Sequence, residues 1–198
     1  CSFHLGPTHV MLDRAFSDAQ QCLNPKNSVK NILIYLGSND QENITEVATL
    51  GICELTGKSV TILLGLNHPH RERLIKFSAS RKNITLIEYV DNIADFMGNF
   101  DLCIGVCGMS VWERFSIGLP SIVCVTAENQ RADADALSRS GAIILIPDRD
   151  KTNPIAWQQA VMLLDANMAK FTFLKNQGRS LVQGWSDNLK QLVKQIAG

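Results

Sequence analysis

Residues 100–125 read FDLCIGVCGMSVWERFSIGLPSIVCV. Two apolar runs, Phe100–Gly105 and Pro120–Val125, flank a segment with helical spacing, Ser110–Ile117, which Gly118 closes. Strands that are apolar throughout and separated by a helix are typical of a parallel sheet covered by helices on both faces. This stretch therefore predicts an α/β fold.

The same alternation extends in both directions along the chain. The other apolar runs expected to be strands are Asn31–Gly37, Ser59–Gly65, Asn83–Tyr89 and Ala142–Ile146. The other segments expected to be helices are Asp40–Thr56, Pro69–Ser80, Asn92–Gly98, Asn129–Ser140 and the chain from Pro154 onward. The whole pattern predicts a Rossmann-like parallel sheet of about six strands with helices on both faces.

The length of 198 residues fits one domain with a small appendage. Residues 1–29 lack a clean period and include the polar stretch Asn24–Ser28, so we interpret them as an interdomain segment or linker. Residues 30–198 are predicted to form the Rossmann-like domain with its C-terminal helices. The chain starts at Cys1 rather than Met, which suggests a fragment of a longer protein.

Composition and charge exclude several classes of protein. Lys plus Arg and Asp plus Glu are 19 each, and a formal net charge of zero argues against a dedicated nucleic-acid binder. No apolar run approaches the roughly 20 residues of a transmembrane helix, and no signal-peptide pattern is visible. None of the six cysteines forms a Cys-x-x-Cys pair, so we expect reduced thiols in a cytoplasmic protein.

Ligands of doubly wound sheets bind at the carboxyl ends of the strands, so the strand-to-helix loops are the candidate sites. In the loop Gly37-Ser38-Asn39-Asp40, glycine permits a sharp turn and a close ligand approach, and the next helix offers free amides to an anion. Ser38 and Gln41 also match a capping box, which is compatible with ligand contact.

The loop from Gly105 to Ser110 carries a second glycine, Gly108, directly before a helix, which suits a phosphate cradle. It lacks both the dinucleotide fingerprint and the Gly-Lys-Ser/Thr ending of a P-loop. A nucleophile elbow is also excluded, because Trp112 occupies the position of its second glycine.

Glu113 has two possible roles that its spacing leaves open. It can close a capping box with Ser110, or its carboxylate can accept hydrogen bonds from a ribose diol. Asn129 is similarly either a helix cap or, with Gln130, a reader of polar ligand atoms. The pair of histidines in His68-Pro69-His70 lacks a third ligand nearby, so we predict no metal site and no cofactor.

Together these loops form a recognisable signature. Its parts are the run 88–97, Asp101-Leu102, the run 105–114, Gly118-Leu119-Pro120 and the run 127–130. Over about residues 4–146 the chain resembles the C-terminal half of the UDP-2,4-diacetamido-2,4,6-trideoxy-β-L-altropyranose hydrolase family of pseudaminic acid biosynthesis. It is similar, more distantly, to the UDP-N-acetylglucosamine transferases that make lipid II. Both have the GT-B architecture of two Rossmann-like domains with the nucleotide sugar between them.

The resemblance implies that this half of the enzyme holds UDP. Tyr89 and Val90 match the segment that recognises uracil, and Glu113 matches the carboxylate that binds the ribose diol. The residues that match the diphosphate loop are Gly108, Met109, Ser110 and Val111. Those that match the loop facing the sugar phosphate are Gly37, Ser38 and Asn39, and those near the hexose are Asn129 and Gln130.

The sequence also departs from that family. The catalytic histidine of the family lies in a Gly-x-Gly-His loop of the N-terminal domain, and that motif does not occur in the 198 residues. No catalytic residue is therefore assigned, and Cys107 and Met109 are bulkier than the family's usual loop residues.

The expected function is the UDP-sugar-binding half of a hydrolase that releases UDP and a free diacetamido-trideoxy hexose. The alternatives are a glycosyltransferase using the same donor and a non-catalytic nucleotide-sugar-binding or interaction module. The expected partners are UDP or a UDP-sugar, an N-terminal GT-B domain and a possible second copy.

Overall fold

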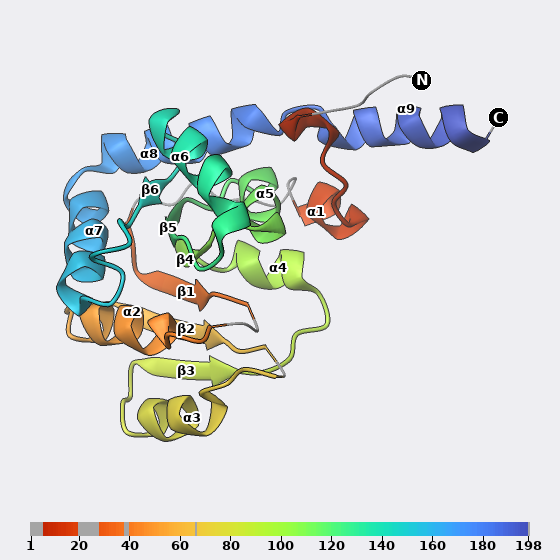
Figure 1. Ribbon diagram of the computed structural model, residues 1–198. Coiled ribbons are helices and arrows are strands. Elements are labelled where there is room, and N and C mark those ends of the chain that lie inside the picture. The colour runs from red at the N-terminus through yellow and green to blue at the C-terminus, as the bar shows by residue number, and fades with distance from the viewer. Residues whose placement is uncertain (1–5, 20–27, 38–39, 66, 198) are drawn as a thin grey trace.

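The computed structural model describes residues 6–19, 28–37, 40–65 and 67–197. It contains one parallel sheet with the strand order β3-β2-β1-β4-β5-β6 (Figure 1). The strands are β1 (Asn31–Tyr35), β2 (Ser59–Leu63), β3 (Ile84–Ile87), β4 (Leu102–Val106), β5 (Ser121–Cys124) and β6 (Ile144–Leu145). The predicted alternation of strands and helices is confirmed.

The strand order reverses between β1 and β4, which are neighbours in the middle of the sheet. Their register pairs Tyr35 with Gly105, so both strands end at the same level. β4 in turn pairs Val106 with Cys124 of β5. All the carboxyl ends therefore lie along one edge, where doubly wound sheets bind ligands.

Alternate strand residues face opposite helical layers, because successive side chains of a strand point to opposite faces. Ile32 and Ile34 pack in the core under α2 (Ile44–Cys53), α3 (Arg71–Ala79) and α7 (Pro154–Ala166). Leu33 belongs to the other core, under α1 (Arg14–Ala19), α4 (Ile93–Gly98), α5 (Met109–Ser116) and α6 (Arg131–Arg139).

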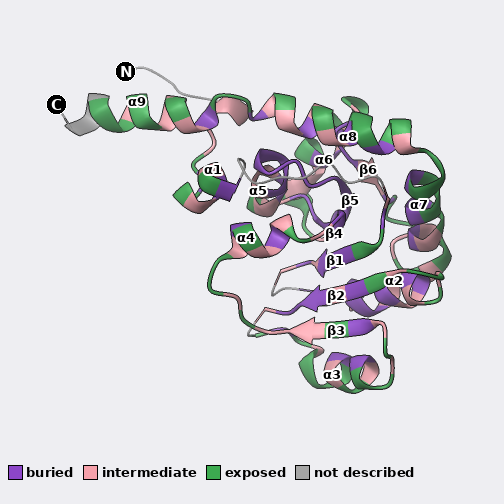
Figure 2. Ribbon diagram, turned by 180° about the vertical axis from the view of Figure 1, so that it is seen from behind, coloured by how far each residue is buried: buried purple, intermediate pink, exposed green. Residues whose placement is uncertain are grey.

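The remaining elements complete the two layers. The helices α8 (Met168–Leu181) and α9 (Trp185–Ala197) run end to end past the sheet, and the 3-10 turns are η1 (Pro7–His9) and η3 (Glu128–Gln130) (Figure 1). β4 and β5 are buried along their whole length, as Figure 2 shows. The two cores thus enclose the centre of the sheet on both faces.

Residues 6–19 pack on the domain, although the sequence assigns them to a linker. Phe16 of α1 is only 1% exposed in the core shared with α4 and α5. The side-chain amide of Asn188 in α9 donates to the Thr8 carbonyl at 2.8 Å. The division of the chain at residue 29 stays a prediction.

Two other expectations concern cysteines and the membrane. Within the described ranges Cys53, Cys103, Cys107 and Cys124 are free thiols, while Cys1 and Cys22 lie outside these ranges. Among the residues that the structure describes, no helix has the length and apolar character required to cross a bilayer.

Candidate functional site

A cleft of about 300 Å³ lies at the carboxyl ends of β1, β2 and β3 and reaches to α5, the helix that follows β4. The residues that line it are Tyr35, Leu63, Leu64, Gly65, Glu88, Tyr89, Val90, Ile93 and Glu113. It spans the point at which the strand order reverses, the usual ligand crevice of such sheets. Three of the predicted site residues, Tyr89, Val90 and Glu113, therefore meet in one cleft.

Glu113 is a half-buried residue of α5, and its carboxylate accepts no hydrogen bond from any residue described in the structure. Burial raises the pKa of Glu113, the Arg114 guanidinium lowers it, and the charge of Asp13 raises it further. The capping-box interpretation is wrong, because Gly108 is the N-cap of α5 and no side chain caps it. The carboxylate is thus available to a ligand that donates hydrogen bonds.

Tyr89 and Val90 form the opposite wall of the cleft, in the loop between β3 and α4. The Tyr89 side chain is 72% exposed, whereas Val90 is half-buried. Glu88, the residue before Tyr89, forms a bidentate ion pair with Arg71 of α3. An exposed aromatic ring beside a fixed backbone segment suits a flat heteroaromatic base.

The loop between β4 and α5 presents backbone amides to solvent. The Val111 amide bonds to the Gly108 carbonyl at 3.0 Å, so the Met109 and Ser110 amides belong to the first turn, which has no intrahelical acceptor. A Cβ atom at Gly108 would meet nothing within 4 Å, so the approach to these amides is open. Cys107, which is bulkier than the usual residue of the family at this position, packs into the core at 3% exposure.

The loop between β1 and α2 is only partly described, because Ser38 and Asn39 lie outside the described residues. Gly37 has a φ of +80°, a backbone conformation that glycine adopts readily. The predicted capping box of Ser38 is wrong, since α2 begins at Ile44. The buried Asp40 carboxylate instead accepts the Ile44 and Thr45 amides, each at 2.8 Å.

Two histidines tie this loop to the loop after β2. His68 is buried with its Nε2 atom 3.6 Å from the Asp40 carboxylate, and His70 Nε2 lies 2.9 Å from the Gln41 carbonyl oxygen. Burial lowers the pKa of His68, which favours the neutral ring. No group of three or more metal-ligating side chains gathers anywhere in the described parts of the chain.

The loop between β5 and α6 lies apart from the cleft. Asn129 is exposed within η3 and is not the helix cap, because the N-cap position of α6 is Gln130. The side-chain oxygen of Gln130 accepts the Thr126 amide at 3.2 Å and so stabilises its own loop. Neither Asn129 nor Gln130 lines the cleft.

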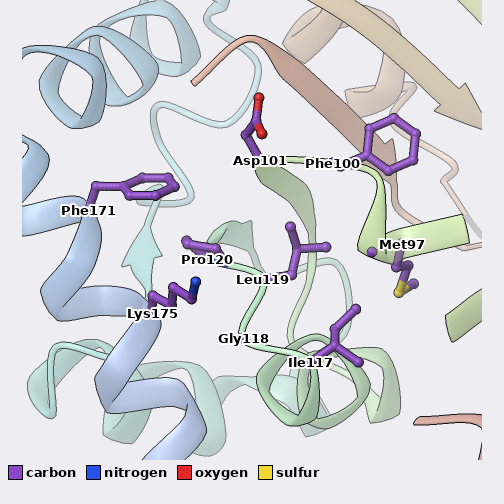
Figure 3. Close-up of a pocket in the computed structure, with 10 residues that line it drawn as sticks. Met97, Phe100, Asp101, Ile117, Gly118, Leu119, Pro120, Phe171 and Lys175 are labelled. Carbon is purple, nitrogen blue, oxygen red and sulfur yellow. The ribbon is translucent and has the colours of Figure 1, made fainter. Parts of the chain in front are cut away.

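A second, much smaller cavity lies at the opposite edge of the sheet (Figure 3). Asp101 and Pro120, which line it, directly precede β4 and β5. Its volume of about 20 Å³ holds one water molecule and excludes a nucleotide. The cleft lined by Tyr35, Tyr89 and Glu113 is taken as the candidate ligand site because of its position at the carboxyl ends of the strands.

Sequence reasoning missed four residues of this edge. Tyr35 lines the cleft, Asp40 and His68 lie close together in two neighbouring loops, and Arg114 of α5 is fully buried. Burial and the charge of Glu113 raise the pKa of Tyr35, which places the phenol in the electrostatic environment of that carboxylate. Asp40 and Arg114 lie in stretches that the sequence analysis singles out, but without a role of their own, and His68 was considered there only as a metal ligand and rejected.

The chain matches the family described as the glycosyltransferase family 28 C-terminal domain over residues 17–191. It is 27% identical over 152 residues to the spore coat polysaccharide biosynthesis protein SpsG of Bacillus subtilis, covering 72% of this chain and 45% of that protein. It is 24% identical over 194 residues to the UDP-N-acetylglucosamine–N-acetylmuramyl-(pentapeptide) pyrophosphoryl-undecaprenol N-acetylglucosamine transferase of Acetivibrio thermocellus, covering 94% of this chain and 53% of that protein.

Among solved structures, the spinosyn rhamnosyltransferase SpnG complexed with thymidine diphosphate superimposes with a TM-score of 0.67 at 16% identity. The superposition covers 87% of this chain and 46% of that one. The predicted fold class, a Rossmann-like sheet of the GT-B type, is thereby confirmed. The chain spans about half the length of the curated relatives it matches.

Proposed function

The chain belongs to the glycosyltransferase family 28 C-terminal domains, and from this premise we propose that it is the UDP-sugar-binding half of a two-domain GT-B enzyme. One observation carries the proposal. Glu113, Tyr89 and Val90 come from separate elements and line one cleft beside the uncapped N-terminus of α5. Tyr89 and Val90 suit a nucleotide base, the Glu113 carboxylate suits a ribose diol, and the N-terminal amides of α5 suit a diphosphate.

In the proposed complex, uracil lies against Tyr89 and Val90, and the ribose hydroxyls donate to the Glu113 carboxylate. The diphosphate accepts hydrogen bonds from the amides of the loop formed by Gly108, Met109, Ser110 and Val111. The N-terminus of α5 carries partial positive charge, so it stabilises the charge that develops on UDP as the sugar departs.

The sugar-facing part of the proposal rests on the resemblance. Gly37, Ser38 and Asn39 would face the sugar phosphate, and Asn129 and Gln130 the hexose. Catalysis needs a base that activates the attacking hydroxyl group or water, and the proposal assigns that base to a preceding domain. This chain supplies the donor half of the reaction.

The acceptor distinguishes two versions of the function. The family match and the similarity to an N-acetylglucosamine transferase favour a transferase, which moves the sugar from UDP to a hydroxyl group of an acceptor molecule. The signature around Glu113 and Gly118 favours the hydrolase of the pseudaminic type, in which water is the acceptor. Product analysis with the full-length protein separates them, because free sugar indicates a hydrolase and a glycosylated acceptor a transferase.

The binding function is tested on this chain by calorimetric titration with UDP, with ADP as the matched control. The proposal expects UDP to bind and ADP to bind at least about tenfold more weakly, since the cleft reads a pyrimidine base. Folded protein that binds neither nucleotide refutes a competent half-site. Equal binding of both refutes the uracil assignment and leaves a general nucleotide or interaction module.

A further inference from the structure

Arg114 is a fully buried cation beneath the loop between β4 and α5. Its side chain is 0% exposed, and its Nε atom has no hydrogen-bond partner. It forms no ion pair with any carboxylate in the described ranges, whereas the exposed Arg71 is paired with Glu88. Burying an unpaired guanidinium costs several kcal/mol, so its retention requires an explanation.

The guanidinium points toward the candidate diphosphate loop. Helical side chains lean toward the N-terminus of their helix, and Arg114 Nη2 donates to the Val106 carbonyl oxygen at 2.8 Å. Val106 is the last residue of β4, directly before the loop that leads into α5. Arg114 Nη1 lies 3.6 Å from the Cys103 sulfur, in the core below.

The sheet leaves space for this group at Gly105. A Cβ atom there would lie 2.1 Å from Arg114 Nη1 and 2.7 Å from the Tyr35 carbonyl oxygen. Any larger residue would therefore collide with the guanidinium in its present place. The absence of a side chain at Gly105 in β4 therefore leaves the space that the Arg114 guanidinium occupies.

Two positive charges converge at the loop in the free protein. The N-terminus of α5 carries a partial positive charge, and the Arg114 guanidinium lies just below it. The charge of the Arg114 guanidinium lowers the pKa of Glu113, whereas burial raises it. The Glu113 side chain nevertheless lines the cleft and forms no ion pair with Arg114 among the described residues. A bound anion at the loop would supply the missing countercharge.

We propose that Arg114 is the buried countercharge for the diphosphate of the ligand held at the β4–α5 loop. This inference rests on the proposed nucleotide-binding function. Because Arg114 has no exposed surface, it acts as a positioning residue, through its electric field and through the Val106 carbonyl that it holds. Its contribution therefore grows with the charge of the ligand.

The test compares UDP with uridine, which lacks the diphosphate, at about pH 8, where the diphosphate is fully ionised. Arg114→Met should weaken UDP binding by roughly 10- to 100-fold and change uridine binding, measured by ligand-observed NMR, by less than about twofold. Arg114→Lys keeps the charge and should retain more UDP affinity than the Met variant. Arg139→Met, an exposed cation on α6, is the matched control and should bind UDP like the wild type.

Stability gives a second readout. Arg114→Met removes a buried charge but also the donor to the Val106 carbonyl oxygen, so the thermal unfolding of each ligand-free variant is measured first and binding is compared only between proteins that fold. A purely structural role predicts equal losses for UDP and uridine. If the Met variant does not fold, UDP and uridine are compared on Arg114→Lys, and equal losses for the two ligands overturn the proposal.

The outcomes separate the two hypotheses. Wild-type protein that binds neither UDP nor inorganic pyrophosphate refutes the proposed function and the role of Arg114 together. Wild-type protein that binds UDP, with an Arg114→Met variant that binds UDP equally well, refutes only the role of Arg114. A loss confined to UDP supports both.

Discussion

Replacing Glu113 by glutamine tests the ribose site most directly. A hydrogen bond to a charged acceptor contributes about 1.5–3 kcal/mol, and the Glu113 carboxylate has no other partner among the described residues. Because Glu113 is only half-buried, water competes for it, so we take the lower part of that range. Glu113→Gln should therefore cost about 1.5–2 kcal/mol of UDP binding, or roughly 10- to 30-fold in Kd.

The assay is calorimetric titration of UDP and 2′-deoxy-UDP into the wild type and the variant. If Glu113 accepts the 2′-hydroxyl, removing that hydroxyl should weaken binding to the wild type much more than to the variant, with a coupling of at least about 0.5 kcal/mol. Glu72→Gln, an exposed acid on α3, is the matched control and should bind UDP unchanged. A folded Glu113→Gln variant with UDP affinity within about twofold of the wild type refutes the assignment.

The same carboxylate should make binding dependent on pH. Burial raises the pKa of Glu113 above its ordinary value of 4.5, and only the ionised form accepts both ribose hydroxyls. UDP affinity should therefore fall as the pH decreases, beginning at a higher pH than an ordinary glutamate would dictate. The terminal phosphate of UDP itself takes up a proton near about pH 6, so the Glu113→Gln variant should keep only that part of the decline. An identical pH profile for both proteins would contradict the mechanism.

Three further predictions concern stability and reactivity. Asp40→Ala should lower the free energy of unfolding by about 2–3 kcal/mol in urea denaturation, because two buried amides of α2 lose their acceptor. Gly51→Ala should lower it by about 1–3 kcal/mol, because the new Cβ would lie 2.1 Å from the Pro154 carbonyl oxygen. Burial raises the pKa of Cys107 to about 11 and of Cys124 to about 12, so neither should react with a thiol reagent at neutral pH in the folded protein.

Each of these predictions has an internal control. Asp40→Asn keeps one acceptor and should cost less than Asp40→Ala, and equal losses would contradict the capping role. Gly98→Ala introduces a Cβ with nothing within 4 Å and should be neutral or stabilising. In unfolded protein Cys107 and Cys124 should label freely, and rapid labelling in the folded state would argue against their burial.

The fold could be read from the sequence because its signals are local. Apolar runs ending at glycine, as at Gly37 and Gly65, mark strands, and the helix expected from Asn92 has Asn92 as its N-cap in the structure. Glu113, Tyr89 and Val90 were predicted from the resemblance and meet in one cleft. Parallel strands bring their ends to one edge, so loops distant in sequence become neighbours.

Tertiary contacts account for what the sequence did not predict. The Ser-x-x-Glu pattern at Ser110 matches a capping box, but α5 begins one residue earlier, after Gly108. His68 and Asp40 lie close together although they belong to two loops that no local pattern connects. The packing of η1 depends on α9, which lies at the other end of the chain, and that of α1 on α4 and α5.

The alignment of all strand ends on one edge has an evolutionary consequence. The residues proposed to determine ligand specificity lie in the loops and at the helix start along the carboxyl edge, whereas the two hydrophobic cores that stabilise the domain lie on the faces of the sheet. Mutations at this edge can therefore change the preferred nucleotide or sugar without disturbing the packing beneath. A descendant of this scaffold can acquire new chemistry one loop at a time while it remains folded throughout.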